Sequence, residues 1–194
     1  MTQALNLDLA KTALVVVDVQ KGIVGYDNIA PIDGQTLVAR NNELADAFAA
    51  AGATVVLVRV RNTGREGFNP LTDAPHAAAK PTDESFTELA LDVKDNQDAD
   101  VVIVDKHNWG AFYGTDLDTQ LRRRGIDTVV LTGIASSIGV DTTAREAAQA
   151  GYNVVFVPEA MTDLSLRAHE FVTEVIFPRL GKSRTVAEVL AAVK

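Results

Sequence analysis

The stretch TVVLTGIASSIGVDTTAREAAQAG, residues 128–151, contains an apolar run, a glycine-containing turn and a helical pattern in direct succession. The run at 128–133 is short and rich in valine, as expected for a strand buried on both faces of a sheet. The pattern that follows predicts a helix that starts near Ser136 or Ser137 and stops at Gly151. A buried strand that turns directly into a helix is the repeating unit of a parallel α/β sheet.

The same unit recurs along the chain. Four other apolar runs are bounded by turn signals: TALVVVD at 12–18, TVVLVRV at 54–60, DVVIVDK at 100–106 and NVVFVPEA at 153–160. Helical patterns alternate with these runs, which implies right-handed crossovers and helices on both faces of the sheet. We therefore predict a three-layer α/β/α doubly wound, Rossmann-like fold. It has a mostly parallel sheet of about six strands and one domain over residues 1–194.

The predicted helices carry start and stop signals. The pattern at 34–52 has one face formed by Leu37, Asn41, Leu44, Ala45 and Phe48. In the pattern at 114–125, Thr115 can cap the helix, with Asp118 in a weak capping box. The last helix begins at Thr185, and Glu188 three residues later completes a capping box.

Residues 62–99 break this rhythm, because they are rich in Pro, Asp, Thr and Gly and lack an apolar run of strand length. Loops of this length in a compact domain are usually functional or disordered. We interpret the segment as a long excursion over the site.

The composition excludes several classes of function. The 194 residues carry a formal net charge of -8, which repels nucleic-acid phosphates and anionic lipids, so we expect neither nucleic acid nor a membrane as partner. No apolar run approaches the roughly 20 residues that cross a bilayer, and the first residues lack a signal-peptide pattern, which indicates a cytoplasmic protein. Cysteine is absent, so disulfides, thiolate metal sites and a cysteine nucleophile are excluded.

The polar residues that close the apolar runs are the candidates for chemistry, because ligands of such sheets bind beyond the carboxyl ends of the strands. These residues are Asp18, Arg59 or Arg61, Lys106 and the turn at 133–139. An acid, cationic side chains and a glycine-containing turn thus converge on one edge from four strands. This pattern indicates an active site.

A structural role is the alternative for each candidate. Asp18 can simply end a strand and cap a turn, and a lone lysine such as Lys106 is more often solvated than catalytic. Gln20 can bond only the neighbouring backbone. Trp109 and Phe112 can belong to the core, although their clustering in a loop after Lys106 favours a pocket wall.

Together these residues resemble the isochorismatase-like hydrolases, the family that also holds nicotinamidases and N-carbamoylsarcosine amidases. The matching pieces are TALVVVDVQKGIV and the stretch from DKHNWGAFYGTDL through TGIASSIGVDTTARE to VPEAMTD, which cover most of residues 10–165 in one order. For the amidase members the resemblance implies a triad of Asp, Lys and Cys, whose positions fall on Asp18, Lys106 and Gly139. The expected nucleophile is therefore missing, and thiolate attack with a thioester intermediate is impossible in this chain.

The nicotinamidases of this family also carry an Asp and His cluster after the second strand. In this chain the region reads VRVRNTGREGFNP, without histidine. We therefore expect no catalytic metal and no cofactor.

Without a thiol, two roles stay open for Asp18. The isochorismatases proper also dispense with the cysteine. The resemblance implies that an acid at this position protonates the methylene of an enolpyruvyl ether, after which water adds and pyruvate leaves. If Lys106 keeps Asp18 ionised, a base that orients water is the better role. Arg59 and Arg61 are candidate partners for the carboxylates of a substrate such as isochorismate.

We also expect substrate contacts at the turn after the fourth strand. The family often has a non-proline cis peptide at the position of Ile134 and Ala135. The helix that starts at Ser136 and Ser137 presents its positive end there, which suits an anionic or oxyanion-forming ligand. Either serine is also a candidate replacement nucleophile, but serine at a helix start is a capping residue far more often.

Two functions stay open at this point. The leading one is a cofactor-independent hydrolase of a small molecule that acts through Asp18 and Lys106. The alternative is a family member that lost catalysis with its cysteine and binds a metabolite or a protein partner. Residues 167–180 carry more apolar bulk than a lone surface helix needs, and relatives of this fold usually assemble, so we predict a homo-oligomer.

Overall fold

Six strands form one sheet in the order β3-β2-β1-β4-β5-β6, and every neighbouring pair is parallel. The computed structural model describes residues 5–61, 70–73 and 84–194. The strands are β1 Thr12–Val17, β2 Thr54–Val60, β3 Val101–Lys106, β4 Thr128–Ile134, β5 Asn153–Thr162 and β6 Lys182–Ser183. The predicted fold class is confirmed, and the one-domain organisation over the whole chain stays a prediction.

The five apolar runs coincide with β1 to β5, because each places alternate side chains in two separate cores. All six residues of β1 are buried. Ala13, Val15 and Val17 face one core, while Leu14 and Val16 face the other. A strand with two buried faces needs an unbroken apolar sequence, which is the pattern that predicted it.

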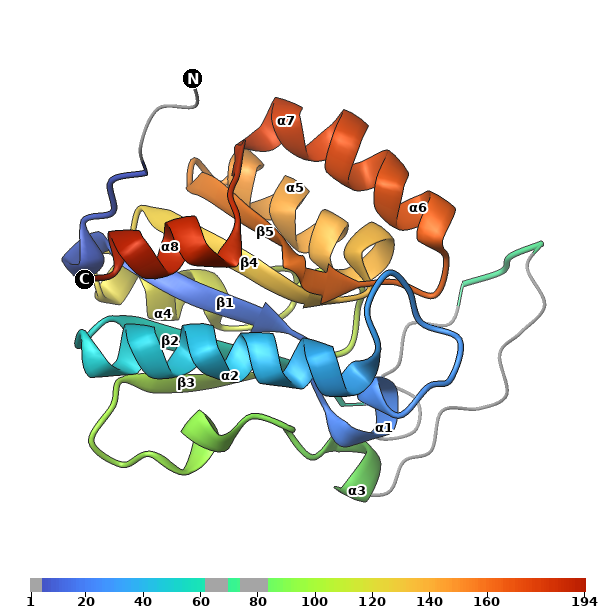
Figure 1. Cartoon of the computed structure of the whole chain (residues 1–194), viewed down its shortest axis with the longest axis horizontal. Coiled ribbons are helices and arrows are strands. Elements are labelled where there is room, and N and C mark those ends of the chain that lie inside the picture. The colour runs from blue at the N-terminus through green and yellow to red at the C-terminus, as the bar shows by residue number, and fades with distance from the viewer. Residues whose placement is uncertain (1–4, 62–69, 74–83) are drawn as a thin grey trace.

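Helices cover both faces of the sheet and complete three layers. They are α1 Lys21–Val24, α2 Gly34–Ala50, α3 Glu84–Thr87, α4 Leu117–Arg123, α5 Asp141–Gln149, α6 Leu166–Phe171, α7 Phe177–Leu180 and α8 Val186–Ala192. The described residues also form four other helical segments, which are the 3-10 turns Leu9–Lys11 and Asp92–Asp95 and the π turns Ser136–Val140 and Val172–Ile176. Buried side chains of α2 and α8 join one core, and those of α4, α5 and α7 join the other. Figure 1 shows α2 and α8 across the near face of the sheet.

Helix α4 corrects one predicted cap. It begins at Leu117 after Asp116, and no capping box forms. The Thr115 hydroxyl accepts a hydrogen bond from the Leu117 N–H at 3.1 Å, while the Asp118 carboxylate accepts one from the Tyr152 hydroxyl at 2.8 Å. Asp118 is thus engaged with the chain that enters β5 and does not reach back to its own helix start. The α8 capping box between Thr185 and Glu188 is present as predicted.

The interpretation of 62–99 as one long excursion is wrong for its last part. Leu89, Leu91 and Val93 are 4%, 0% and 3% exposed and pack in the core beside α2. The Ala90 N–H also donates to the Val19 carbonyl at 3.0 Å. Apolar residues at every second position thus fill the core through a segment that forms no strand of the sheet. Most of the earlier part, residues 62–69 and 74–83, lies outside the described residues.

The apolar bulk at 167–180 mainly serves this chain's own core. Val172 and Phe177 are 4% and 0% exposed, and the Phe177 ring stacks on Phe156 of β5 with centroids 4.0 Å apart. Phe171 is the exception, since it is 55% exposed. The amount of apolar bulk is therefore explained without a partner, and only Phe171 and its neighbours are left to support an assembly.

Candidate active site

The candidate site lies where the strand order reverses. β1 and β4 are neighbours, and the chain leaves them toward opposite ends of the sheet. Such a switch point leaves a crevice at the carboxyl ends of the two strands. Asp18 follows β1, Gly139 lies in the π turn after β4, and Lys106 ends β3.

Asp18 and Lys106 form a buried ion pair that spans β2. The Lys106 Nζ lies 2.8 Å from the Asp18 Oδ2, and the two side chains are 2% and 9% exposed. Lys106 Nζ also donates to the carbonyl oxygens of Asn108 and Trp109, at 3.1 Å and 2.8 Å. An ammonium has three hydrogens to donate, so these three acceptors fix its position.

The backbone of Asp18 aims its side chain at the site. Its φ is 55°, in the left-handed region that few residues other than glycine adopt. The Asp18 N–H still donates to the Val58 carbonyl of β2 at 2.9 Å. Such a conformation is typical of functional sites, because the surrounding structure must hold it in place.

Gly139 stands directly against this carboxylate. A Cβ atom built on Gly139 would lie 3.1 Å from the Asp18 Oδ2 and 3.2 Å from the Val17 Cγ1. The position to which the resemblance assigned a nucleophile is therefore occupied by a glycine that faces a buried carboxylate. Gly133 permits the close approach of β4 to β1 beside this position, since its φ is 115° and a Cβ there would lie 2.1 Å from the Val17 carbonyl oxygen.

The turn after β4 is held by a buried polar cluster that we call the Ser136–Asp163–His169 cluster. The peptide bond between Ile134 and Ala135 is cis. The Asp163 Oδ2 accepts hydrogen bonds from the Ser136 hydroxyl at 3.0 Å and the Ser137 N–H at 2.6 Å. Because the carboxylate only accepts, the remaining 3.0 Å contact of the Ser136 oxygen is with a donating His169 Nδ1–H.

This cluster gives Ser136 a structural role. Ser136 is fully buried, and its oxygen is engaged by Asp163 and His169 instead of facing Asp18. Burial lowers the pKa of His169 below its usual 6.5, although Asp163 and Glu170 oppose the shift. The neutral imidazole is thus the form that the cluster holds.

Sequence reasoning missed Asp163 and His169. Asp163 directly follows β5, so the rule that singled out Asp18 and Lys106 would have found it had the strand been extended to Thr162. His169 lies on α6 and had no such signal.

Arg59 and Arg61 share one acidic partner. The Asp105 carboxylate lies 2.6 Å from the Arg59 Nε and 3.2 Å from an Arg61 guanidinium nitrogen. Burial raises the pKa of Asp105, but hydrogen bonds from both arginines outweigh it and leave that pKa lowered. The two guanidiniums and one carboxylate keep one net positive charge, so the pair is less available to a dicarboxylate than the sequence suggested.

Three other predicted contacts have different surroundings. The Gln20 side chain is fully buried; its amide oxygen accepts from the Val60 N–H at 2.9 Å, and its amide nitrogen donates to the Phe86 carbonyl at 3.0 Å. The Phe112 ring packs on the core and on Tyr152, with centroids 5.6 Å apart. Trp109 is half-exposed and lines a pocket, so it matches the predicted wall better than Phe112 does.

The described part of the chain holds no group of three or more His, Asp or Glu side chains that could bind a metal ion. No described helix is long and apolar enough to cross a membrane.

A doubly wound sheet with a buried carboxylate–ammonium pair at its switch point is an architecture suited to small-molecule hydrolysis. The family model of the isochorismatase domain matches residues 12–188 of this chain. The chain therefore belongs to the isochorismatase family, as its sequence motifs predicted.

Known relatives agree with this assignment. The chain is 45% identical to the uncharacterized isochorismatase family protein YwoC of Bacillus subtilis, over 100% of both chains. It is 29% identical to the ureidoacrylate amidohydrolase RutB of Stutzerimonas stutzeri, over 81% of this chain and 72% of that protein. The structure of an isochorismatase family protein from Burkholderia thailandensis is 42% identical and superposes with a TM-score of 0.90, over 98% of this chain and 99% of that one.

Proposed function

We propose that this protein hydrolyses a small molecule without a thiol, with Asp18 as the acid–base group and Lys106 as its fixed counter-charge. The observation that carries the proposal is the direction of Asp18. Its Oδ2 faces Gly139 and touches the Lys106 ammonium at 2.8 Å. A buried carboxylate thus points at the place where other family members are expected to carry their nucleophile.

Of the two roles open to Asp18, the geometry favours the base. A carboxylate and an ammonium in direct contact stabilise each other's charged forms. An ionised Asp18 can take a proton from a water molecule while the water oxygen bonds to the electrophilic atom of the substrate, and it can later return that proton to the leaving group. Hydrolysis of an enolpyruvyl ether instead requires a protonated Asp18 at the start, since a proton must first reach the methylene carbon.

Isochorismate is the candidate substrate for the other role, in which Asp18 starts protonated and acts as the acid. The excess positive charge of the Arg59–Arg61–Asp105 group supports binding of one substrate carboxylate. The backbone from Ile134 to Ser137 and the start of the helix at Gly139 support a contact to a second anionic group.

The alternative is a protein that binds a metabolite or a protein partner without turnover. The absence of cysteine favours it, because the covalent route of the amidase members is closed. A protein of this kind would still use the Asp18–Lys106 pair as a polar contact for its ligand.

The test is pyruvate release from isochorismate and ammonia release from a panel of small amides, by the native protein and Asp18→Asn. The proposal expects release that falls by about 100-fold or more in Asp18→Asn, while Asp141→Asn, a matched change on α5, keeps its rate. Gly139→Ala provides a second variant if Asp18→Asn is unstable, because the added Cβ would lie 3.1 Å from the Asp18 Oδ2 and crowd the carboxylate. Release that is unchanged in both variants would overturn the role of Asp18, whereas no release with any substrate would support the binding alternative.

We further propose that the protein assembles with copies of itself. Leu164, Leu166 and Phe171 are 44%, 46% and 55% exposed beside a pocket that Ser165, Arg167 and Ala168 line. Exposed apolar side chains in one group are typical of a protein interface.

A further inference from the structure

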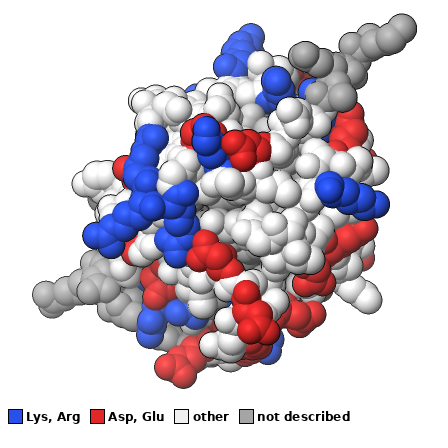
Figure 2. All heavy atoms as spheres, turned by 90° about the vertical axis from the view of Figure 1, so that its left-hand side faces the viewer, with Lys and Arg blue, Asp and Glu red and all other residues white. Residues whose placement is uncertain are grey.

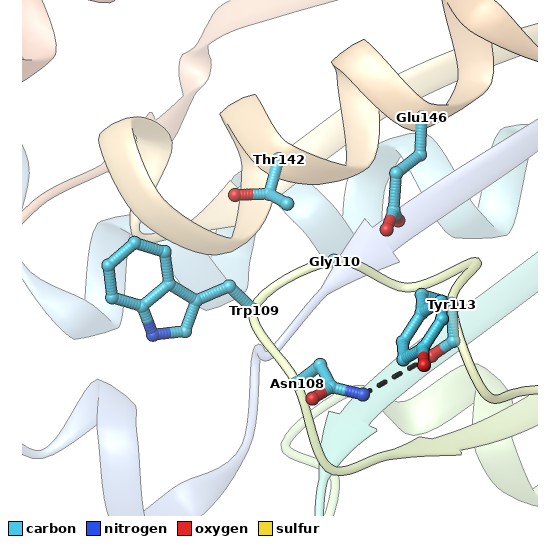
Figure 3. Close-up of a pocket in the computed structure, with 6 residues that line it drawn as sticks. All are labelled: Asn108, Trp109, Gly110, Tyr113, Thr142 and Glu146. Atoms are coloured by element: carbon cyan, nitrogen blue, oxygen red, sulfur yellow. Dashed lines mark hydrogen bonds between the residues drawn. The ribbon is translucent and has the colours of Figure 1, made fainter. Parts of the chain in front are cut away.

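A pocket of about 300 Å³ lies between the loop after β3 and helix α5. Figure 3 shows the side chains that line it, which are Asn108, Trp109, Gly110, Tyr113, Thr142 and Glu146. Neither Asp18, Lys106 nor Gly139 is among them. The pocket nevertheless borders the candidate active site, because the carbonyls of Asn108 and Trp109 hold the Lys106 ammonium.

Two aromatic side chains form the ends of this pocket. Trp109 and Tyr113 are 51% and 74% exposed, which is unusual for rings of this size. Figure 3 shows them apart from each other on the loop, with Asn108 between them. The faces of Trp and Tyr rings carry negative potential and attract cations more strongly than neutral groups.

Among the described residues that line the pocket, Glu146 alone is charged. Its Oε2 accepts a hydrogen bond from the Phe112 N–H at 2.9 Å. Gly110 makes room for this carboxylate, since a Cβ there would lie 2.2 Å from the Oε2 atom. Among the ion pairs of the described residues none includes Glu146, and the neighbouring Arg145 is engaged by Asp141 at 3.0 Å. Within the described part of the chain, Glu146 thus accepts from a backbone N–H and has no cationic partner.

We propose that this pocket binds a small organic cation, of the quaternary or alkylammonium class. The two rings favour a positive charge of low hydration, and Glu146 supplies the opposite charge at the pocket wall. Asn108 and Thr142 offer polar groups for a hydroxyl or a similar substituent on the cation. An anionic ligand would meet the Glu146 carboxylate and two electron-rich rings, so it does not fit.

The chain offers an internal probe for this site, because Trp109 is its only tryptophan. The native protein is titrated with choline at constant ionic strength while the tryptophan fluorescence is recorded. A second titration uses 3,3-dimethylbutan-1-ol, the neutral isostere of choline, which has the same shape without the charge. We expect a saturable change in the Trp109 fluorescence with choline. The affinity for the alcohol should be lower than that for choline by about tenfold or more. Equal affinity for the two compounds, or no saturable change with choline, would overturn the proposal.

Two variants locate the site. Glu146→Gln keeps an oxygen that accepts from the Phe112 N–H but removes the charge, and Tyr113→Ala removes an exposed ring. Each should weaken choline binding by about tenfold or more, whereas the matched Glu174→Gln, an exposed change on the neighbouring π turn, should change it by less than about twofold. Choline binding that survives both pocket variants would place the cation elsewhere and contradict the inference. The readout is binding alone, so its outcome does not depend on whether the protein is a hydrolase.

Discussion

At the scale of single residues, the site is organised around the pairing of opposite charges inside the protein. Removing one partner of a buried ion pair costs about 3–5 kcal/mol of stability, because the other charge is left without compensation. Asp18 and Lys106 are therefore candidate catalytic groups, and each is also needed to compensate the buried charge of the other. Gly139 leaves room beside the carboxylate, since a Cβ there would lie 3.1 Å from the Asp18 Oδ2 and the carboxylate would have to shift slightly.

His169 should make the stability of the protein depend on pH. Burial lowers its pKa below 6.5 in the folded state, whereas the unfolded chain takes up a proton near 6.5. The unfolded state thus binds more protons just below this pH, so the free energy of unfolding should fall as pH drops, by at most about 1.4 kcal/mol per pH unit.

The measurement is the free energy of unfolding by urea between pH 5 and 8, for the native protein and His169→Asn. Asparagine can still donate to Ser136 but does not titrate in this range, so its curve should be flatter below pH 6.5. Parallel curves for the two proteins would contradict the prediction.

At the scale of secondary structure elements, the ends of the helices decide where each element sits. Helix α8 is short, and Val189 and Val193 anchor it to the core at 0% and 5% exposure. Its N-terminus is fixed by Thr185 and Glu188, which exchange hydrogen bonds of 3.1 Å and 2.8 Å between side chain and backbone. Such reciprocal caps satisfy N–H groups that the first turn leaves without a partner.

Replacing this cap should have a measurable cost. Thr185→Ala removes the hydroxyl that accepts from the Glu188 N–H and should lower the free energy of unfolding by about 1 kcal/mol. Thr185→Ser keeps the hydroxyl and should stay close to the native value. Chemical denaturation of the three proteins checks this, and equal stability of the alanine and serine variants would refute it.

At the scale of the whole molecule, charged side chains and exposed apolar side chains gather on different parts of the surface. Figure 2 views the edge at which the strands begin, opposite the candidate site, and shows acidic and basic side chains interspersed there. Pairs such as Arg124 with Asp100 at 2.8 Å, and Arg122 with Asp118 at 3.3 Å, contribute to this mixed surface. The exposed apolar group at Leu164, Leu166 and Phe171 belongs instead to the segment around α6.

The proposed assembly is predicted to depend on this apolar group. Sedimentation of the native protein should show a species larger than the 20.7 kDa chain, and Phe171→Lys should shift it to the monomer, because burial of a charge at an interface is costly. Ile103→Lys, at an exposed apolar residue on the edge strand β3, should keep the native mass. A native protein that sediments only as a monomer would exclude the assembly.

The sequence by itself determined the fold class, the five longer strands and the positions of Asp18, Lys106 and Gly139. It could do so because strands buried on both faces require unbroken apolar runs, and because parallel strands bring the residues at their ends to one edge.

Only the tertiary structure decided which of the predicted side chains remain available to a ligand. Arg59 and Arg61 are engaged by Asp105, Gln20 by the backbone and Ser136 by Asp163 and His169. These partners are far apart in sequence, and no local pattern encodes a contact between residues that meet only when the chain is folded.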